Sequence, residues 1–133
     1  MVSVIIPHYD DLKRLDLCLA SVAKQNLPSE VFEVIVSDNG SPDGETAIAD
    51  LVGERARLVF AKERGAGPAR NYGARVARGT VLAFLDCDCR AEPSWLAEGL
   101  RALSQVDFAG GRVKVLVEDE TNLTAAEAFE REF

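Results

Sequence analysis

The chain has 133 residues, 47% of them hydrophobic, which suits one globular domain or part of a larger protein. Its formal net charge of −7 argues against a nucleic-acid-binding surface, because such surfaces carry basic patches. No apolar run approaches the roughly 20 residues that span a bilayer, and the first residues lack a signal-peptide pattern. We therefore expect no transmembrane segment in this chain and a cytoplasmic location, with peripheral membrane contact reserved for the full-length protein.

Strands and helices alternate along the sequence. In chain order, the predicted elements are a strand at 2–6, a helix at 11–25, a strand at 32–36, a helix at 45–52, a strand at 58–61, a helix at 69–78, a strand at 81–85 and a helix beginning at 92–94. A strand within residues 108–117, interrupted by Gly110 and Gly111, and a helix at 124–133 complete the series. This alternation predicts an α/β fold, Rossmann-like, with a mostly parallel sheet and helices on both faces. We expect the first strand to lie between the second and the fourth.

The strand at 81–85 is the most informative element, because it ends in two carboxylates. Its unbroken apolar run predicts a strand buried on both faces. Asp86 and Asp88 follow it, at the sheet edge where ligands of α/β folds bind. If the strand geometry continues, both side chains point to the same side and repel each other unless a cation lies between them. A hard divalent ion, Mg²⁺ or Mn²⁺, suits such a pair, although two solvated acids in a turn remain the alternative.

The other strand ends carry polar or glycine-rich chemistry as well. Tyr9 can stack on a flat ring, and Asp38 can accept hydrogen bonds from a base or ribose. The loop around Gly67 allows backbone amides to approach phosphates, and Arg70 can add charge-assisted bonds to a diphosphate. Structural roles are the alternative: packing at the sheet edge, turn formation, a tight strand-to-helix connection and an ion pair. His8, the only histidine, is interpreted as a loop residue and left out of the site.

Four segments together resemble the family 2 glycosyltransferases of the GT-A fold in order and spacing, and they are residues 2–9, 33–44, 67–73 and 84–88. The resemblance covers nearly the whole chain. It implies a nucleotide-diphospho-sugar donor, with a UDP-sugar expected first, and a Mg²⁺ or Mn²⁺ ion. It also implies inverting transfer of the sugar to the hydroxyl of a saccharide or lipid-linked acceptor.

The same resemblance assigns roles to single residues. The implied donor-binding residues are Pro7, Tyr9, Asp38, Gly67, Arg70 and Asp86, and the implied metal ligands are Asp88 and Asp86. Among them, Tyr9 and Asp38 hold the nucleoside, and Arg70 lies near the nucleotide or near the Asp38 carboxylate. The two acids after the fourth strand hold the ribose and the metal-bound diphosphate.

One departure from the family pattern concerns the catalytic base, which relatives carry in a later acidic motif. We expect it beyond Phe133, because residues 118–120, although acidic, come too early and are interpreted as a solvated turn. The chain then corresponds to a single donor-binding domain over 1–133, which binds donor but has little or no transferase activity alone. Apolar surface left by a missing acceptor half predicts a homo-oligomer, with Phe129 and Phe133 at the contact.

Two other protein classes remain open from the sequence. Gly65 and Gly67 follow a strand and open a helix, and Asp86 lies about 20 residues further on, as in dinucleotide-binding folds. However, Arg70 occupies the third glycine position, where close packing needs a small residue. A non-catalytic module that binds nucleotide sugars is the second alternative.

Overall fold

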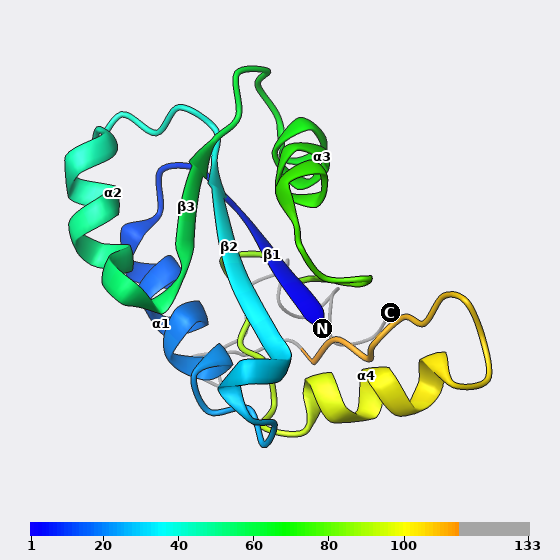
Figure 1. The fold of residues 1–133 in the computed structure, drawn as a ribbon. Coiled ribbons are helices and arrows are strands. Elements are labelled where there is room, and N and C mark those ends of the chain that lie inside the picture. Colours follow the sequence, from blue (N-terminus) through cyan, green and yellow to red (C-terminus); the bar gives the residue numbers. More distant parts are fainter. Residues whose placement is uncertain (115–133) are drawn as a thin grey trace, which may run out of the picture.

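The computed structural model describes residues 1–114, which form a four-stranded parallel sheet with helices on both faces (Figure 1). The elements are β1 (Val2–His8), α1 (Leu12–Val22), β2 (Phe32–Asp38), α2 (Glu45–Val52), β3 (Arg57–Phe60), α3 (Ala66–Val76), β4 (Val81–Phe84) and α4 (Trp95–Leu103), with 3₁₀ helices at Ser29–Val31 and Gly53–Arg55. The strand order is β3-β2-β1-β4, so β1 lies between β2 and β4 as predicted. Within this part of the chain, none of the helices has the length and apolar character needed to cross a membrane.

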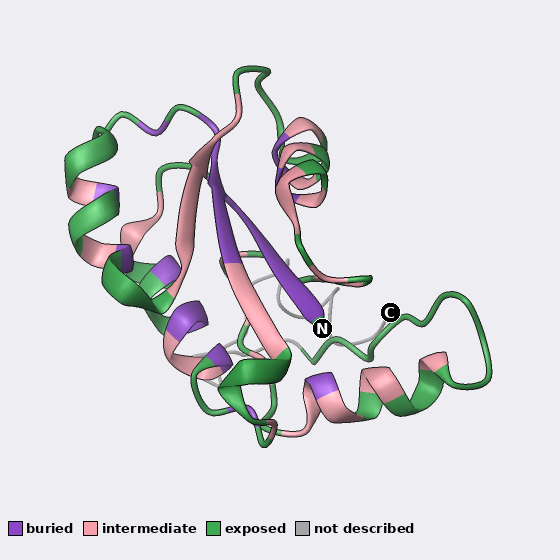
Figure 2. Ribbon diagram, in the orientation of Figure 1, coloured by how far each residue is buried: buried purple, intermediate pink, exposed green. Residues whose placement is uncertain are grey.

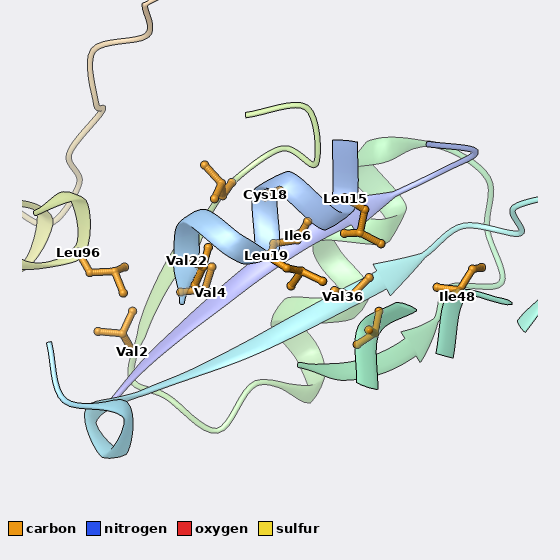
Figure 3. Packing of buried hydrophobic residues seen from close by; sticks show 12 residues of the cluster. Val2, Val4, Ile6, Leu15, Cys18, Leu19, Val22, Val36, Ile48 and Leu96 are labelled. Carbon is orange, nitrogen blue, oxygen red and sulfur yellow. The ribbon is translucent and has the colours of Figure 1, made fainter. Parts of the chain in front are cut away.

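Different helices pack on the two faces of β1, because successive side chains of a strand point to opposite sides. On one face, Val4 and Ile6 belong to a core cluster that side chains of α1, α2 and α4 complete (Figure 3). On the other face, a Cβ atom on Gly73 of α3 would lie 2.6 Å from the Cγ2 atom of Ile5. β1 is therefore buried over its whole length (Figure 2). The residues that follow its carboxyl end start from a fixed position.

β1 continues through Pro7 to His8, although the sequence predicts an end at Pro7. The backbone of successive strand residues faces alternate neighbours. The Ile5 carbonyl accepts the Leu85 N–H on the β4 side (3.1 Å), and the His8 carbonyl accepts the Asn39 N–H on the β2 side (3.0 Å). Pro7 faces the β4 side, where pairing has already ended. Its missing N–H therefore costs no ladder bond, and the strand can continue.

β4 is an edge strand of the described sheet, so the prediction of a strand buried on both faces is wrong. Its register with β1 places Leu82 and Phe84 on the α3 face, where they are 42% and 46% exposed. α3 packs against β1 and β2 and leaves these two side chains uncovered by the described residues. An apolar run shows that a strand packs on something, but the neighbouring elements decide how many of its faces are covered.

The helices begin and end close to the predicted positions, except that α3 begins earlier. Gly65 takes its N-cap position with φ of +120°, and Gly67 and Pro68 lie in its first turn. Pro68 is tolerated there because the first N–H groups of a helix have no partner within the helix. Arg70 consequently lies in the second turn of α3 rather than the first. At α1, Asp11 is the N-cap residue, and its carboxylate accepts the Arg14 N–H at 2.9 Å.

The end of the described region departs from the prediction as well. The sequence predicts that a strand lies within residues 108–117, and the described part of that range, residues 108–114, forms none. Gly110 and Gly111 weaken strand formation there, and no described strand pairs with this segment. Four predictions concern residues outside the described part of the chain: the rest of that strand, the acidic segment 118–120, the helix at 124–133, and Phe129 and Phe133 at a contact.

Gly79 lies in the connection from α3 to β4, next to the first residues of β1. A Cβ atom at this position would lie 2.6 Å from the Met1 carbonyl oxygen and 2.8 Å from the Ser3 nitrogen. These are backbone atoms beside the first strand and cannot move aside easily. We expect Gly79→Ala to lower the free energy of unfolding by about 1–3 kcal/mol, the usual cost of overpacking, measured by urea denaturation.

Gly99→Ala is the matched control for that substitution. Gly99 lies within α4, and a Cβ atom there would meet no heavy atom within 4 Å. Alanine is favoured over glycine inside a helix, so this variant should gain up to about 1 kcal/mol. Equal unfolding free energies for the two variants would contradict the steric explanation.

Candidate functional site

The carboxyl ends of the strands meet at one edge of the sheet, here called the carboxyl edge. His8 at the end of β1 is in register with Asp38 at the end of β2, and Asp38 is in register with Phe60 of β3. β4 ends beside Ile5 of β1, and Asp86 follows it. The structure therefore places Asp38 and Asp86 at the same edge, as the β-α alternation predicts.

His8, Asp38 and Ser41 form a buried cluster at the junction of β1 and β2. The Nδ1 atom of His8 lies 2.9 Å from one carboxylate oxygen of Asp38, Oδ2. The Ser41 hydroxyl donates to the same oxygen at 2.5 Å. The other oxygen, Oδ1, accepts the N–H groups of Gly40 and Ser41 at 2.9 and 3.1 Å. Asp38 is 1% exposed, and these four donors use the lone pairs that a carboxylate offers.

The cluster keeps Asp38 charged. Burial raises the pKa of Asp38, but the hydrogen bonds from Ser41, His8 and Gly40 outweigh burial and lower the pKa below its ordinary value. A base or ribose that approaches Asp38 would meet a carboxylate that is already held by hydrogen bonds within the protein. A new donor would have to replace one of the four existing ones.

Asn39 joins the end of β2 to the start of α3. Its side-chain nitrogen donates to the Glu63 carbonyl, and its side-chain oxygen accepts the Gly65 N–H. The side chain is buried, and its two bonds tie the loop before α3 to the sheet. The N-terminus of α3 is thereby fixed beside the end of β2.

Arg70 and Asp86 form an ion pair between α3 and the segment after β4. A guanidinium N–H of Arg70 donates to a carboxylate oxygen of Asp86, and both side chains are partly exposed. An ion pair is the structural alternative that the sequence leaves open for Arg70, and the structure shows one with Asp86. The role near the nucleotide implied by the family resemblance stays a prediction. Because surface ion pairs contribute little free energy, this pair can open or share its charge with a ligand.

Asp86 and Asp88 lie on a turn and do not continue the strand, which corrects the geometry expected from the sequence. The Asp86 carbonyl accepts the Cys89 N–H at 2.9 Å and also lies 3.6 Å from the Cys18 sulfur. These contacts bend the chain immediately after β4. Both carboxylates are exposed on this turn, and the Asp88 carboxylate lies 3.6 Å from the Cys89 sulfur.

Three cysteines lie at this turn: Cys18 packs against it from α1, and Cys87 and Cys89 are part of the segment itself. Cys18 of α1 is buried in the core, as predicted. Burial, the neighbouring thiols of Cys87 and Cys89, and then Asp88 and Asp86 raise the pKa of Cys18 to about 12. Burial is also the main cause that raises the pKa of Cys87 and Cys89. Burial therefore disfavours the thiolate form of all three cysteines.

Asp86 and Asp88 fit a metal ion that has further oxygen ligands from elsewhere. Residues 1–114 contain no group of three or more His, Cys, Asp or Glu side chains that could hold a metal ion alone. Mg²⁺ is commonly bound by one or two carboxylates together with the phosphates of a substrate. Two exposed carboxylates on one turn match an ion of that kind.

The hollows of the surface do not all lie at this edge. One of them, of about 520 Å³, lies at the opposite edge, among the first residues of β2 and β3 and the end of α1. Arg57 and Glu33 form an ion pair beside it, with 3.5 Å between nitrogen and oxygen. A smaller hollow of about 140 Å³ lies between α3 and the loop that follows β3, and Tyr72 and Arg75 contribute to its wall. We favour the carboxyl edge as the functional site, because ligands of open α/β sheets bind there.

Comparison with known families is decisive for the class of protein. The family described as Glycosyl transferase family 2 matches residues 3–131. The chain belongs to glycosyl transferase family 2. The family resemblance predicted from four sequence segments is thus confirmed, and the match extends over residues 3–131.

Among curated members of family 2, the glycosyltransferase AglE of Haloferax volcanii is 39% identical to this chain over 119 residues. The alignment covers 85% of this chain and 39% of AglE. The chain therefore spans about two fifths of the length of that relative.

Solved structures of similar fold agree with the family 2 assignment. Residues 1–349 of S. aureus TarS in complex with UDP superpose with a TM-score of 0.68 and 28% identity, over 78% of this chain and 32% of that chain. The mannosyltransferase PcManGT of Pyrobaculum calidifontis, in complex with GDP-Man and Mn²⁺, gives a TM-score of 0.67 and 25% identity, over 79% and 32%. The predicted GT-A fold is confirmed.

In this family 2 chain, the remaining predicted donor residues occupy different surroundings. Tyr9 is 53% exposed beyond the end of β1, where its ring is free to stack on a ligand. Pro7 is buried within β1 and can offer only its backbone. Gly67 lies in the first turn of α3, close to the free N–H groups of that helix.

The site residues predicted from the sequence leave out three residues that organise the site: His8, Asn39 and Ser41. Their partners lie on other strands or loops, up to 33 positions away in the chain. A signal was nevertheless present. Once β1 and β2 are assumed to be parallel neighbours, a histidine and an aspartate end the two strands at matching positions, which indicates a pair.

Proposed function

We propose that this protein contributes the donor site of a glycosyltransferase that transfers a sugar from a nucleotide-diphospho-sugar to an acceptor hydroxyl. Membership of family 2 is the observation that carries the proposal. Two further facts support it: the solved relatives hold UDP or GDP-Man, and polar groups gather at the carboxyl edge. A nucleoside diphosphate, with UDP tested first, is the expected ligand.

The proposed binding roles follow the positions of the side chains. The exposed ring of Tyr9 would stack on the base, and the fixed carboxylate of Asp38 would border the nucleoside. The N-terminus of α3 and the Arg70 guanidinium would face the diphosphate. Asp86 and Asp88 would hold a Mg²⁺ or Mn²⁺ ion, whose charge offsets that of the diphosphate as it leaves.

The proposed transfer inverts the configuration of the sugar. A base removes the proton of the acceptor hydroxyl, the oxygen bonds to the anomeric carbon, and the carbon–diphosphate bond breaks. We place this base beyond Phe133 and propose that the isolated chain binds donor without efficient turnover. Loss of a general base typically costs 10²–10⁴-fold in rate.

Ligand-induced thermal stabilisation tests the proposal. UDP with Mn²⁺, at about 100-fold over its dissociation constant, should stabilise the full chain by about 2.7 kcal/mol, or roughly 10 °C in Tm. GDP with Mn²⁺ and NAD are the comparison ligands. Stabilisation by NAD and by neither nucleoside diphosphate would instead favour the dinucleotide-binding class.

A further inference from the structure

We propose that His8 is a positioning residue that shapes the nucleoside end of the donor site through Asp38. This inference rests on the proposed function, because it concerns the affinity of the site for a nucleoside diphosphate. His8 is 2% exposed, so it cannot be a contact residue without rearrangement. Its effect must pass through the groups that it holds.

The two ring nitrogens of His8 face partners of opposite kind. Nδ1 lies 2.9 Å from the Asp38 carboxylate, which can only accept, so Nδ1 must carry the proton. Nε2 lies 3.3 Å from the Asp11 nitrogen and accepts its N–H. The neutral ring with its proton on Nδ1 satisfies both contacts, whereas the other neutral form satisfies neither.

These two bonds fix the exposed turn between β1 and α1. Asp11 is the N-cap residue of α1, and His8 ends β1, so Tyr9 and Asp10 form a short bridge that is held at both ends. Asp10 has φ of +50°, and its N–H donates to the Ser41 hydroxyl at 2.9 Å. The conformation of the bridge that carries the Tyr9 ring therefore depends on the same cluster that orients Asp38.

The bond to Asp38 should matter more than the bond to Asp11. It is shorter, 2.9 against 3.3 Å, and its acceptor is a charged carboxylate. Hydrogen bonds to charged groups are roughly twice as strong as neutral ones. Losing it would leave Asp38 with three donors and free the β1 end to shift relative to the β2 end.

Two amide substitutions separate the two bonds. In His8→Asn, the side-chain nitrogen can occupy the place of Nδ1 and still donate to Asp38, but the acceptor for Asp11 is lost. In His8→Gln, the amide reaches the place of Nε2 and can accept the Asp11 N–H, but the donor to Asp38 is lost. The pair keeps size and polarity similar while it deletes one bond at a time.

UDP affinity in the presence of Mn²⁺, measured on the full chain well below the Tm of each variant, is the readout. We expect His8→Gln to bind UDP about tenfold more weakly than wild type and His8→Asn to stay within about threefold. A merely structural histidine would lower the Tm of both variants without separating their affinities. Equal affinities, or the reverse order, would overturn the proposal.

A spectroscopic measurement covers the case in which His8→Gln does not fold. Because the chain has one histidine, ¹⁵N-histidine labelling gives one set of ring signals. The wild type should show a protonated Nδ1 and an unprotonated Nε2, before and after UDP is added. A proton on Nε2 would refute the proposed geometry.

The experiment also distinguishes failure of the proposed function from failure of the proposed role of His8. If wild type binds neither UDP nor GDP with Mn²⁺, the donor site itself is wrong, and the role of His8 falls with it. If wild type binds UDP and both variants bind equally well, the donor site stands and the positioning role alone is wrong.

Discussion

Asp38→Asn is expected to lower the free energy of unfolding by about 2–4 kcal/mol. Its carboxylate accepts four hydrogen bonds in a buried cluster, and bonds to charged groups contribute about 1.5–3 kcal/mol. An amide can keep one oxygen on the N–H groups of Gly40 and Ser41. Its NH₂ group then faces the His8 Nδ1–H, so two donors oppose each other inside the protein.

The loss of stability should depend on pH in a defined direction. The pKa of Asp38 is lowered in the folded protein, so its charged form stabilises the fold above the unfolded pKa, which is about 3.9. This stabilisation is lost as the pH falls through the folded pKa. Wild type and Asp38→Asn should therefore differ most near neutral pH and converge below about pH 4.

Urea denaturation at several pH values measures this effect. Asp43→Asn is the matched control, because Asp43 lies exposed in the same loop and the change in charge is identical. The control should stay within about 0.5 kcal/mol of wild type, as surface substitutions usually do. A stability loss no larger for Asp38→Asn than for Asp43→Asn would rule out the buried cluster as the cause.

Asp88→Asn is expected to weaken the binding of UDP with Mn²⁺ by at least about tenfold, or ~1.4 kcal/mol. In the proposed site, this carboxylate coordinates the ion that joins protein and diphosphate. Without the ion, the acids and the anionic ligand repel each other, and the net charge of −7 adds to this at long range. The substitution keeps the shape of the side chain and removes its charge.

Titration calorimetry with UDP, with Mn²⁺ or with a chelator, tests the metal assignment. Asp88 is exposed, and within residues 1–114 its side chain is hydrogen-bonded to Cys89 alone, so the variant should unfold like wild type. Asp38→Asn should weaken UDP binding with and without the ion, when it is measured below its own Tm. Unchanged affinity in Asp88→Asn would exclude its role as a ligand, and indifference of wild type to chelator would remove the metal from the donor site.

The sheet could be predicted from the sequence because its strands are apolar runs. The polar residues of the candidate site could be predicted only in part. A buried parallel strand needs a run of β-branched residues, and β1 and β2 show one that is visible locally. The role of His8 depends on a partner 30 positions away, which no local pattern displays. Its burial follows from strand register, and register is a property of two strands together.

Other differences between the prediction and the structure also arise from tertiary contacts. β4 has the composition of a doubly covered strand, but α3 crosses above β1 and β2 and leaves Phe84 exposed. The turn that carries Asp86 depends on contacts with Cys89 and Cys18 rather than on strand geometry. The sequence could place these acids at the correct edge but could not give their relative orientation.

The bonds around Asn39 also bear on the chemical ageing of the protein. Asn39 precedes Gly40, and in flexible chains a glycine nitrogen attacks the side-chain carbonyl of a preceding asparagine, which releases ammonia. Here the Gly40 N–H is held by Asp38 at 2.9 Å, and the Asn39 amide is bonded at both ends. Ring closure must first break these bonds, so deamidation is tied to local unfolding. Water opens the resulting cyclic imide to aspartate or isoaspartate, and neither carboxylate can donate to the Glu63 carbonyl, so the loop before α3 would be released.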